Sequence, residues 1–126
     1  MTDAKVWSER PCAPPPGTVV CAFADVADGA ARAFRFGRGW QAFELLVVRA
    51  GEVAYGYVNE CAHNPLPLNI DERIFTAGDK VHCDHHYAVF RFADGLCVDG
   101  VCKGERLIAV PLERSGDDVR IATANG

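Results

Sequence analysis

Short runs of β-forming residues, each ended by a turn signal, constrain the fold of this chain more than any other feature. Nine such runs can be read from the sequence, at 18–23, 33–36, 43–49, 53–58, 80–82, 87–92, 96–98, 107–110 and 119–121. Glycines separate most of them, as expected at the turns of an antiparallel sheet. No segment carries the apolar spacing of a three-turn amphipathic helix, and only the alanine-rich stretch 25–33 could form a helical turn. The sequence therefore predicts an all-β chain, folded as an antiparallel sandwich or small barrel.

Two of these runs differ in pattern in a way that predicts their surroundings. Residues 43–49 are almost continuously apolar, which is typical of a strand covered on both faces. Residues 53–58 alternate with the period of two expected of a strand with two unlike faces. Gly51 lies in the short turn between them. We therefore expect the two runs to pair as a hairpin.

The length of 126 residues allows one domain with one substantial core. Residues 1–17 include three consecutive prolines, which cannot continue a helix or a central strand. We expect an extended N-terminal arm over 1–17, followed by a single domain over 18–126. A proline-rich docking peptide is the alternative interpretation of the arm.

The balance of charges disfavours two classes of partner. The chain carries 13 Lys and Arg against 17 Asp and Glu, a formal net charge of −4. A nucleic-acid-binding domain usually shows a basic stripe, and a surface that binds anionic lipid usually shows a polybasic patch. No apolar run approaches the roughly 18–20 residues of a membrane-spanning helix, and no secretory signal is visible. We expect a cytoplasmic protein that binds neither nucleic acid nor membrane.

Cysteines and histidines gather in one window of the sequence. The chain has six cysteines, which in a reducing compartment indicate metal ligands or redox groups rather than a disulfide framework. All four histidines lie within 63–86, in the pattern Cys61-x-His63, nineteen residues, Cys83-x-x-His86. Each short pair can aim two ligands inward from one tight loop. Zinc accepts two Cys and two His, usually as a Cys pair followed by a His pair, whereas the mixed order fits an iron pair with both imidazoles on one iron.

This mixed pattern resembles the signature of the Rieske family, which has Cys-x-His on one loop and Cys-x-x-His on the next. The resemblance covers roughly residues 18–122. It includes the strand that leads into Cys61, the Pro67-Leu68 that follows His63, and the segment 95–107, whose Gly and Cys spacing is similar to that of small Rieske ferredoxins. The resemblance implies a Rieske-like β fold with a cluster-binding subdomain over about 60–104. It implies that Cys61, His63, Cys83 and His86 hold one [2Fe-2S] cluster per chain, which a third loop near 98–104 covers.

Two positions depart from the family pattern close to the expected cluster. Tyr87 stands where the family usually has a glycine after the second histidine, and Gly100-Val101 stands where the third loop usually has Gly-Pro. The second loop could therefore be rearranged, or Tyr87 could partly cover the site. The cover loop is expected to be less rigid than usual.

The resemblance also points to the low-potential branch of the family. The high-potential branch has a cysteine in each ligand loop and two hydroxyl residues beyond the second histidine. Those positions are Leu66, His85, Ala88 and Phe90 here. Hydrogen bonds to sulfur favour the reduced cluster, so their loss lowers the potential. We expect a midpoint toward the low end of the range of about −150 to +300 mV.

The remaining cysteines and histidines have simpler interpretations. His82 and His85 are expected to be structural or solvent-exposed rather than ligands. Cys97 and Cys102 flank Gly100, and could be small packing residues beside the third loop, a disulfide or a redox relay.

Function follows by elimination. An oxygenase of this superfamily also needs a mononuclear iron held by two His and one carboxylate, but the two spare histidines lie inside the ligand loops. The chain is therefore expected to be no enzyme alone but a one-electron carrier, which passes electrons from a flavoprotein reductase to a terminal oxygenase by transient docking at a His63/His86 tip. The alternatives are a redox- or iron-sensing regulatory module and a zinc-stabilised binding domain. The sequence does not specify the donor, the acceptor or the oxygenase substrate.

Overall fold

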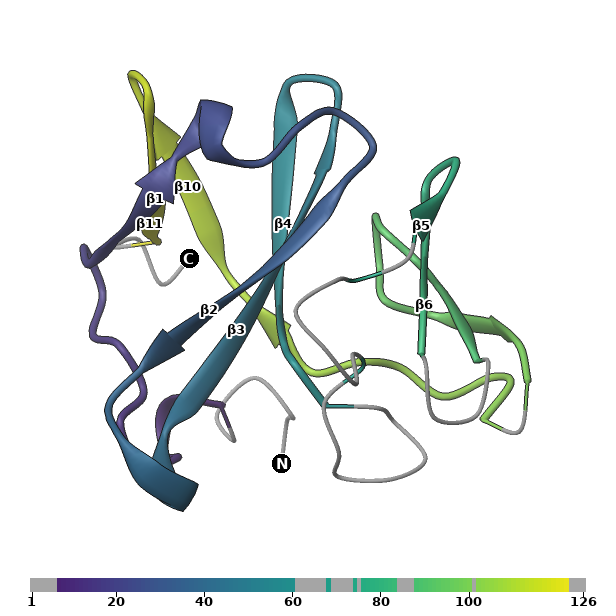
Figure 1. The fold of residues 1–126 in the computed structure, drawn as a ribbon, viewed down its shortest axis with the longest axis horizontal. Helices are drawn as coiled ribbons and strands as arrows, with labels where there is room; N and C mark the ends of the chain where they lie inside the picture. The colour runs from purple at the N-terminus through teal and green to yellow at the C-terminus, as the bar shows by residue number, and fades with distance from the viewer. Residues whose placement is uncertain are drawn as a thin grey trace.

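The computed structural model of the chain describes residues 7–60, 68, 74, 76–83, 88–100 and 102–122. Within these residues the chain forms eleven strands in three antiparallel sheets, and helical structure is confined to single turns (Figure 1). The predicted all-β, antiparallel fold class is thus confirmed. No helix among the described residues has the length and apolar character needed to cross a membrane.

The three longest strands, β2, β3 and β4, lie in a four-stranded sheet with the order β2-β3-β4-β9. Its strands are β2 (Ala31–Phe36), β3 (Phe43–Ala50), β4 (Val53–Val58) and β9 (Ala109–Val110). The predicted hairpin is present, since Ala50 pairs with Val53 across the turn that Gly51 begins. Gly51 has a φ of 63°, in the left-handed region that glycine adopts without strain. This turn fixes the register of β4, which leads directly toward the first predicted ligand loop.

The strand β3 divides the core into two clusters. Successive side chains of a strand point to opposite faces. Leu45 and Val47 belong to the cluster that contains Trp7 and Phe23, whereas Leu46 and Val48 belong to the other cluster. All four β3 side chains are fully buried, as the continuous apolar run predicted. The strand β3 therefore contributes to both clusters. We call the part of the fold around the cluster with Trp7 and Phe23 the first half, and the part around the cluster with Leu46 and Val48 the second half.

The first half is closed by a three-stranded sheet in the order β1-β11-β10. Its strands are β1 (Val19–Ala22), β10 (Leu112–Ser115) and β11 (Asp118–Ile121). Within the N-terminal segment, the buried Trp7 packs edge-on against Phe43 with ring centroids 6.2 Å apart. The first described residues therefore pack into this half of the core.

The second half is a small four-stranded sheet that lies apart from the other two in Figure 1. Its strands are β5 (Thr76–Ala77), β6 (Lys80–His82), β7 (Val89–Arg91) and β8 (Cys97–Asp99), paired in chain order. Its core contains Cys83, Phe90 and Phe92 together with Leu46 and Val48 of β3. This sheet carries the described part of the predicted cluster-binding region.

Several elements differ from the sequence expectations. The stretch 25–33 forms no α-helical turn: a 3-10 turn covers Phe23–Asp25, and β2 already begins at Ala31. The run at 107–110 is a strand only at Ala109–Val110, with a single bridge between Leu96 and Arg106 before it. The strands β5 and β10 were not predicted. Their sequences lack a run of β-branched residues, so pairing with a neighbouring strand decides their structure rather than local propensity.

Candidate metal centre

Of the four predicted ligands, the structure describes Cys83. Cys61, His63 and His86 lie outside the described residues, as do Leu66, His85 and Tyr87. Cys83 comes directly after β6, is fully buried, and is not part of a disulfide. Among the residues that the structure describes, no group of three or more Cys, His, Asp or Glu side chains is placed to hold a metal ion. What the structure shows of this site is the backbone at the ends of the two predicted ligand loops.

The second ligand loop is closed at its base by the β6–β7 pair. Val81 pairs with Phe90 and His82 with Val89, and Cys83 continues the same register toward Ala88. The N–H of Cys83 donates to the carbonyl oxygen of Ala88 at 2.8 Å. Four residues, 84–87, connect these two buried positions. The strand pair thus fixes the backbone on both sides of the segment that contains His86.

The third loop contacts the end of the second. Gly100 has a φ of 105°, and a β-carbon built on it would lie 2.8 Å from the Cα of Ala88. Real β-carbons do not approach a backbone atom that closely, so only glycine permits this contact. The predicted cover loop therefore packs against Ala88, the residue that ends the second ligand loop.

The first ligand loop is fixed at its base by Asn59, which sequence reasoning did not identify. Asn59 is buried, lies two residues before Cys61, and directly precedes the segment 60–67, which Leu68 directly follows. Its backbone N–H donates to the carbonyl oxygen of Glu44 at 2.9 Å, and its side-chain amide donates to the Glu44 carboxylate at 3.2 Å. Its side-chain oxygen accepts the N–H of Leu68 at 3.1 Å. A polar Asn directly after a buried strand is the only sequence signal of this role.

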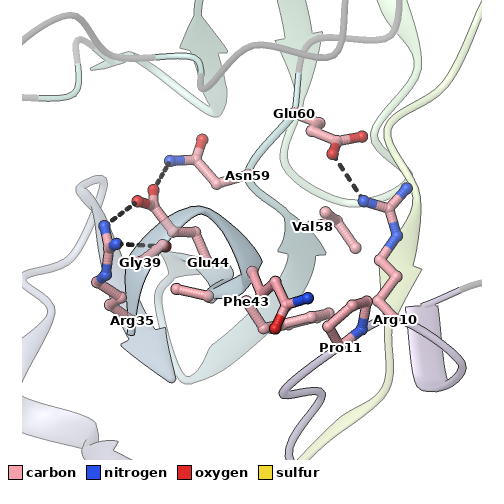
Figure 2. A pocket seen from close by; sticks show the side chains of 11 residues that line it. Arg10, Pro11, Arg35, Gly39, Phe43, Glu44, Val58, Asn59 and Glu60 are labelled. Carbon is pink, nitrogen blue, oxygen red and sulfur yellow. Dashed lines mark hydrogen bonds and ion pairs between the residues drawn. The ribbon is translucent and has the colours of Figure 1, made fainter. Parts of the chain in front are cut away.

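A pocket of about 430 Å³ lies beside Asn59 and Glu60. Figure 2 shows two ion-pair networks on opposite sides of it, with Phe43 and Val58 between them. On one side Arg35 contacts Glu44 at 3.3 Å, which in turn accepts from Asn59. On the other side Arg10 contacts Glu60 at 2.6 Å. Because Glu60 directly precedes Cys61, the N-terminal segment helps to hold the start of the first loop.

The described donor fits an iron–sulfur or zinc ligand. A thiolate ligand needs to be shielded from water and aimed from a fixed backbone. Cys83 meets both conditions, since it is fully buried and its N–H is bonded across the base of its loop. The neighbouring Ala88 and Phe90 are also fully buried and carry no hydroxyl group. On the described side, the surroundings of Cys83 therefore lack the two hydroxyl donors that mark the high-potential branch.

Comparison with solved structures supports the resemblance that the Cys and His spacing predicts. No family model and no curated protein sequence matches the chain. A chain of the solved complex of reduced oxygenase and oxidized ferredoxin in carbazole 1,9a-dioxygenase is similar, with a TM-score of 0.66 and 27% identity over 82% of this chain and 90% of that one. The ferredoxin of carbazole 1,9a-dioxygenase from Nocardioides aromaticivorans IC177 gives a TM-score of 0.68 at 20% identity, over 87% of this chain and 100% of that one.

The same fold also occurs within a larger protein. The terminal oxygenase of carbazole 1,9a-dioxygenase from Novosphingobium sp. KA1 matches 98% of this chain with a TM-score of 0.71 and 19% identity, but only 32% of its own length is covered. The two ferredoxin comparisons, in contrast, cover nearly the whole of those chains. The resemblance that the Cys and His spacing predicted is thereby confirmed: the chain has the fold of the Rieske-type ferredoxins.

Proposed function

We propose that this chain is a Rieske-type ferredoxin that carries one electron at a time to an oxygenase. The observation that carries the proposal is the coincidence of a Cys-x-His and Cys-x-x-His pattern with a fold that covers almost the full length of ferredoxins from oxygenase systems. One of these relatives comes from a complex between an oxygenase and its ferredoxin. The solved complex supports an oxygenase as the acceptor.

In this proposal, Cys61, His63, Cys83 and His86 would hold a [2Fe-2S] cluster through two thiolates and two imidazoles. The cluster supplies one-electron chemistry when bound. The protein positions its ligands: the Cys83–Ala88 hydrogen bond fixes the second loop, and Asn59 fixes both ends of the first. The segment around Gly100 packs on Ala88 and helps to exclude water. The domain spans 18–126, with its cluster-binding part over about 60–104.

The chemistry of the frame supports a low potential and a small docking tip. Ala88 and Phe90 offer no hydroxyl to sulfur, which leaves the reduced cluster less stabilised. Two histidine ligands at the edge of the cluster would form the point at which electrons leave. The net charge of −4 favours association with a basic flavoprotein reductase as donor. We propose a cytoplasmic location for this carrier.

Turnover tests this function directly. The purified, cluster-loaded chain is added to a flavoprotein reductase, NADH and a terminal oxygenase with its aromatic substrate. Product should form only when the chain is present, and the Cys83→Ser variant, which lacks one thiolate ligand, should not support it. A chain that takes up the cluster but never passes electrons to any oxygenase would support the sensing module instead.

A zinc-stabilised domain is the remaining candidate, because a buried thiolate such as Cys83 suits zinc as well as iron. Metal analysis of the protein purified without oxygen separates the two. One bound zinc ion per chain, with no iron and no acid-labile sulfide, would overturn the electron-transfer proposal.

A further inference from the structure

Two cysteines that the cluster does not use lie almost in bonding contact. The Sγ atoms of Cys97 and Cys102 are 3.1 Å apart, and both residues are 1% exposed. A disulfide bond needs about 2.05 Å between the sulfur atoms, so a movement of about 1 Å would close it. Neither cysteine is disulfide-bonded in the structure.

The backbone holds the two thiols together independently of their own contact. Residues 97–100 and 102–105 form the two sides of a tight hairpin, in which the N–H of Cys97 donates to the carbonyl oxygen of Glu105 at 2.8 Å and the N–H of Gly104 donates to the carbonyl oxygen of Cys97 at 2.9 Å. The N–H of Glu105 donates to Cys102 at 2.8 Å. These bonds fix both cysteines on one small element. Their proximity is therefore built into the hairpin and does not depend on side-chain rotation alone.

The direction of the hydrogen bonds makes the two thiols unequal. Cys102 donates its S–H to the sulfur of Cys97, and Cys97 donates its own S–H to the carbonyl oxygen of Asp99 at 3.1 Å. A hydrogen bond accepted by sulfur stabilises a thiolate there. We therefore assign Cys97, whose sulfur accepts, as the attacking thiol, and Cys102, with its Sγ 3.1 Å away, as the thiol placed to attack the Cys97 sulfur in a mixed disulfide.

We propose that Cys97 and Cys102 form a reversible dithiol–disulfide site, oxidised by a low-molecular-weight disulfide such as oxidised glutathione. The thiolate of Cys97 attacks one sulfur of the glutathione disulfide and releases one glutathione thiolate. The thiolate of Cys102 then attacks Cys97 in the mixed disulfide, forms the Cys97–Cys102 bond and releases the second glutathione. Two thiols lose two electrons and two protons, and one external disulfide becomes two thiols. Because the pair is buried, the reagent enters when the hairpin opens locally.

The site is distinct from the other described thiols. Cys21 is buried alone on β1, where desolvation and the nearby Asp25 carboxylate raise the pKa of its thiol to about 11. Cys12 is exposed in the N-terminal segment. Among the described residues, neither of these two thiols forms a hydrogen bond with a second sulfur. These two cysteines serve as internal controls.

The consequence for the metal centre rests on the proposed function. Gly100 lies within the loop that the disulfide would close, and it packs on Ala88 at the end of the second ligand loop. Closing a short loop restricts its opened forms. The disulfide would therefore hold the cover loop in place, where the chain has Gly100-Val101 instead of a stiffer Gly-Pro pair.

Trypsin offers a sharp test, because cleavage after Arg91 and Lys103 places both cysteines in the peptide 92–103. The full cluster-loaded chain is equilibrated in glutathione buffers of increasing oxidation, acid-quenched, unfolded, alkylated and digested. We expect the peptide 92–103 to change from doubly alkylated to unalkylated with two fewer hydrogen atoms, and to return on treatment with dithiothreitol. The peptide that holds Cys12 and Cys21 should show no internal disulfide in the same samples. In Cys102→Ala, glutathione should remain bound to Cys97.

A peptide 92–103 that stays doubly alkylated in the most oxidising buffer would overturn the proposal, as would a disulfide found only between other cysteines or between chains. Glutathione trapped on Cys102 in Cys97→Ala, but not on Cys97 in Cys102→Ala, would overturn the assignment of the nucleophile. Amide hydrogen exchange over 97–105 should slow by about tenfold or more on oxidation if the bond restrains the loop. The absorption and EPR signals of the cluster, read on the same samples, report separately on the proposed function, so failure of one leaves the other measurable.

Discussion

The buried side chain of Asn59 joins β3 to the residue that follows the first predicted ligand loop, since its amide donates to Glu44 and its oxygen accepts from Leu68. Removal of the amide would leave the Leu68 N–H without this acceptor in a fully buried position. A buried donor left without a partner costs about 1–3 kcal/mol. We expect Asn59→Ala to lower the free energy of unfolding by about that amount and to speed cluster loss.

Urea unfolding, followed by far-UV circular dichroism and by the visible absorbance of the cluster, checks this prediction. Gln41→Ala is the matched control, because Gln41 is exposed on the rim of the same pocket and should change stability by less than about 0.5 kcal/mol. Equal stability of the two variants would show that Asn59 does not fix the loop.

Gly100 allows the third loop to contact the second, and a neighbouring glycine provides its control. Gly100 and Gly104 both have positive φ, at 105° and 95°, so an alanine is strained at either. Only at Gly100 would the new β-carbon also meet Ala88, at 2.8 Å, because nothing lies within 4 Å at Gly104. We expect both variants to lose about 1 kcal/mol or more of stability, and Gly100→Ala to lose more.

The difference between these two glycine variants isolates the contact with Ala88. Their urea midpoints give the stability, and the rate of cluster bleaching by a chelator gives the protection of the site. Bleaching should be faster in Gly100→Ala than in Gly104→Ala. If both variants bleach at the rate of the unaltered chain, the third loop does not cover the cluster.

Single elements show what the sequence could and could not predict. The apolar run of β3 predicted a strand covered on both faces, because successive residues 45–48 are buried in alternate clusters and are all apolar. The hairpin to β4 followed from one turn glycine. By contrast, β10 depends on a partner strand, since Leu112–Ser115 pairs with β11 in a register that local residues do not encode.

The turn between β7 and β8 carries a prediction about pH. Arg91 donates to the Asp94 carboxylate, and the N–H of Leu96 donates to it at 3.0 Å. The hydrogen bond from Arg91, followed by that from Leu96, lowers the pKa of Asp94 to about 2. An unfolded aspartate has a pKa of about 3.9. Because the folded pKa is the lower one, this stabilisation is fully present above about pH 4 and is lost as the pH falls through about 2.

Comparison of the chain with Asp94→Asn tests this assignment. The asparagine keeps an oxygen acceptor for Leu96 but cannot carry the charge that Arg91 pairs with. We expect the chain to be more stable than Asp94→Asn at pH 5, with the difference in urea midpoint shrinking between about pH 4 and pH 2. A difference that stays constant over that interval would show that Asp94 does not titrate as assigned.

At the scale of the whole molecule, the predicted ligands and the contacts around them differ in how far apart in sequence their residues lie. Spacing alone predicts the four ligands, because each Cys and His pair lies within a few residues in sequence, and this assignment stays a prediction. The contacts at the start of the first predicted ligand loop could not be predicted, because they join residues distant in sequence. Arg10 contacts Glu60, and Glu44 contacts Asn59. Pairing across such separations follows only from the folded topology.

The topology also shows how the segments next to the predicted ligand loops are supported by the largest sheet. The strand β3 contributes Leu46 and Val48 to the core of the small sheet formed by β5, β6, β7 and β8, where Cys83 and Ala88 are buried. This small sheet is therefore packed against the largest sheet of the molecule. The same fold occurs in a ferredoxin over its whole length and as one part of a much longer oxygenase.

The EPR spectrum of the purified protein after reduction with dithionite tests the central claim most directly. A cluster held by two cysteines and two histidines should give a rhombic signal whose average g value lies below that of two-iron clusters held by four cysteines. Cys83→Ser should lose this signal, whereas Cys21→Ser, at the isolated buried thiol of β1, should keep it. A colourless, EPR-silent protein that contains zinc would contradict the account, because the same residues would then hold a structural metal.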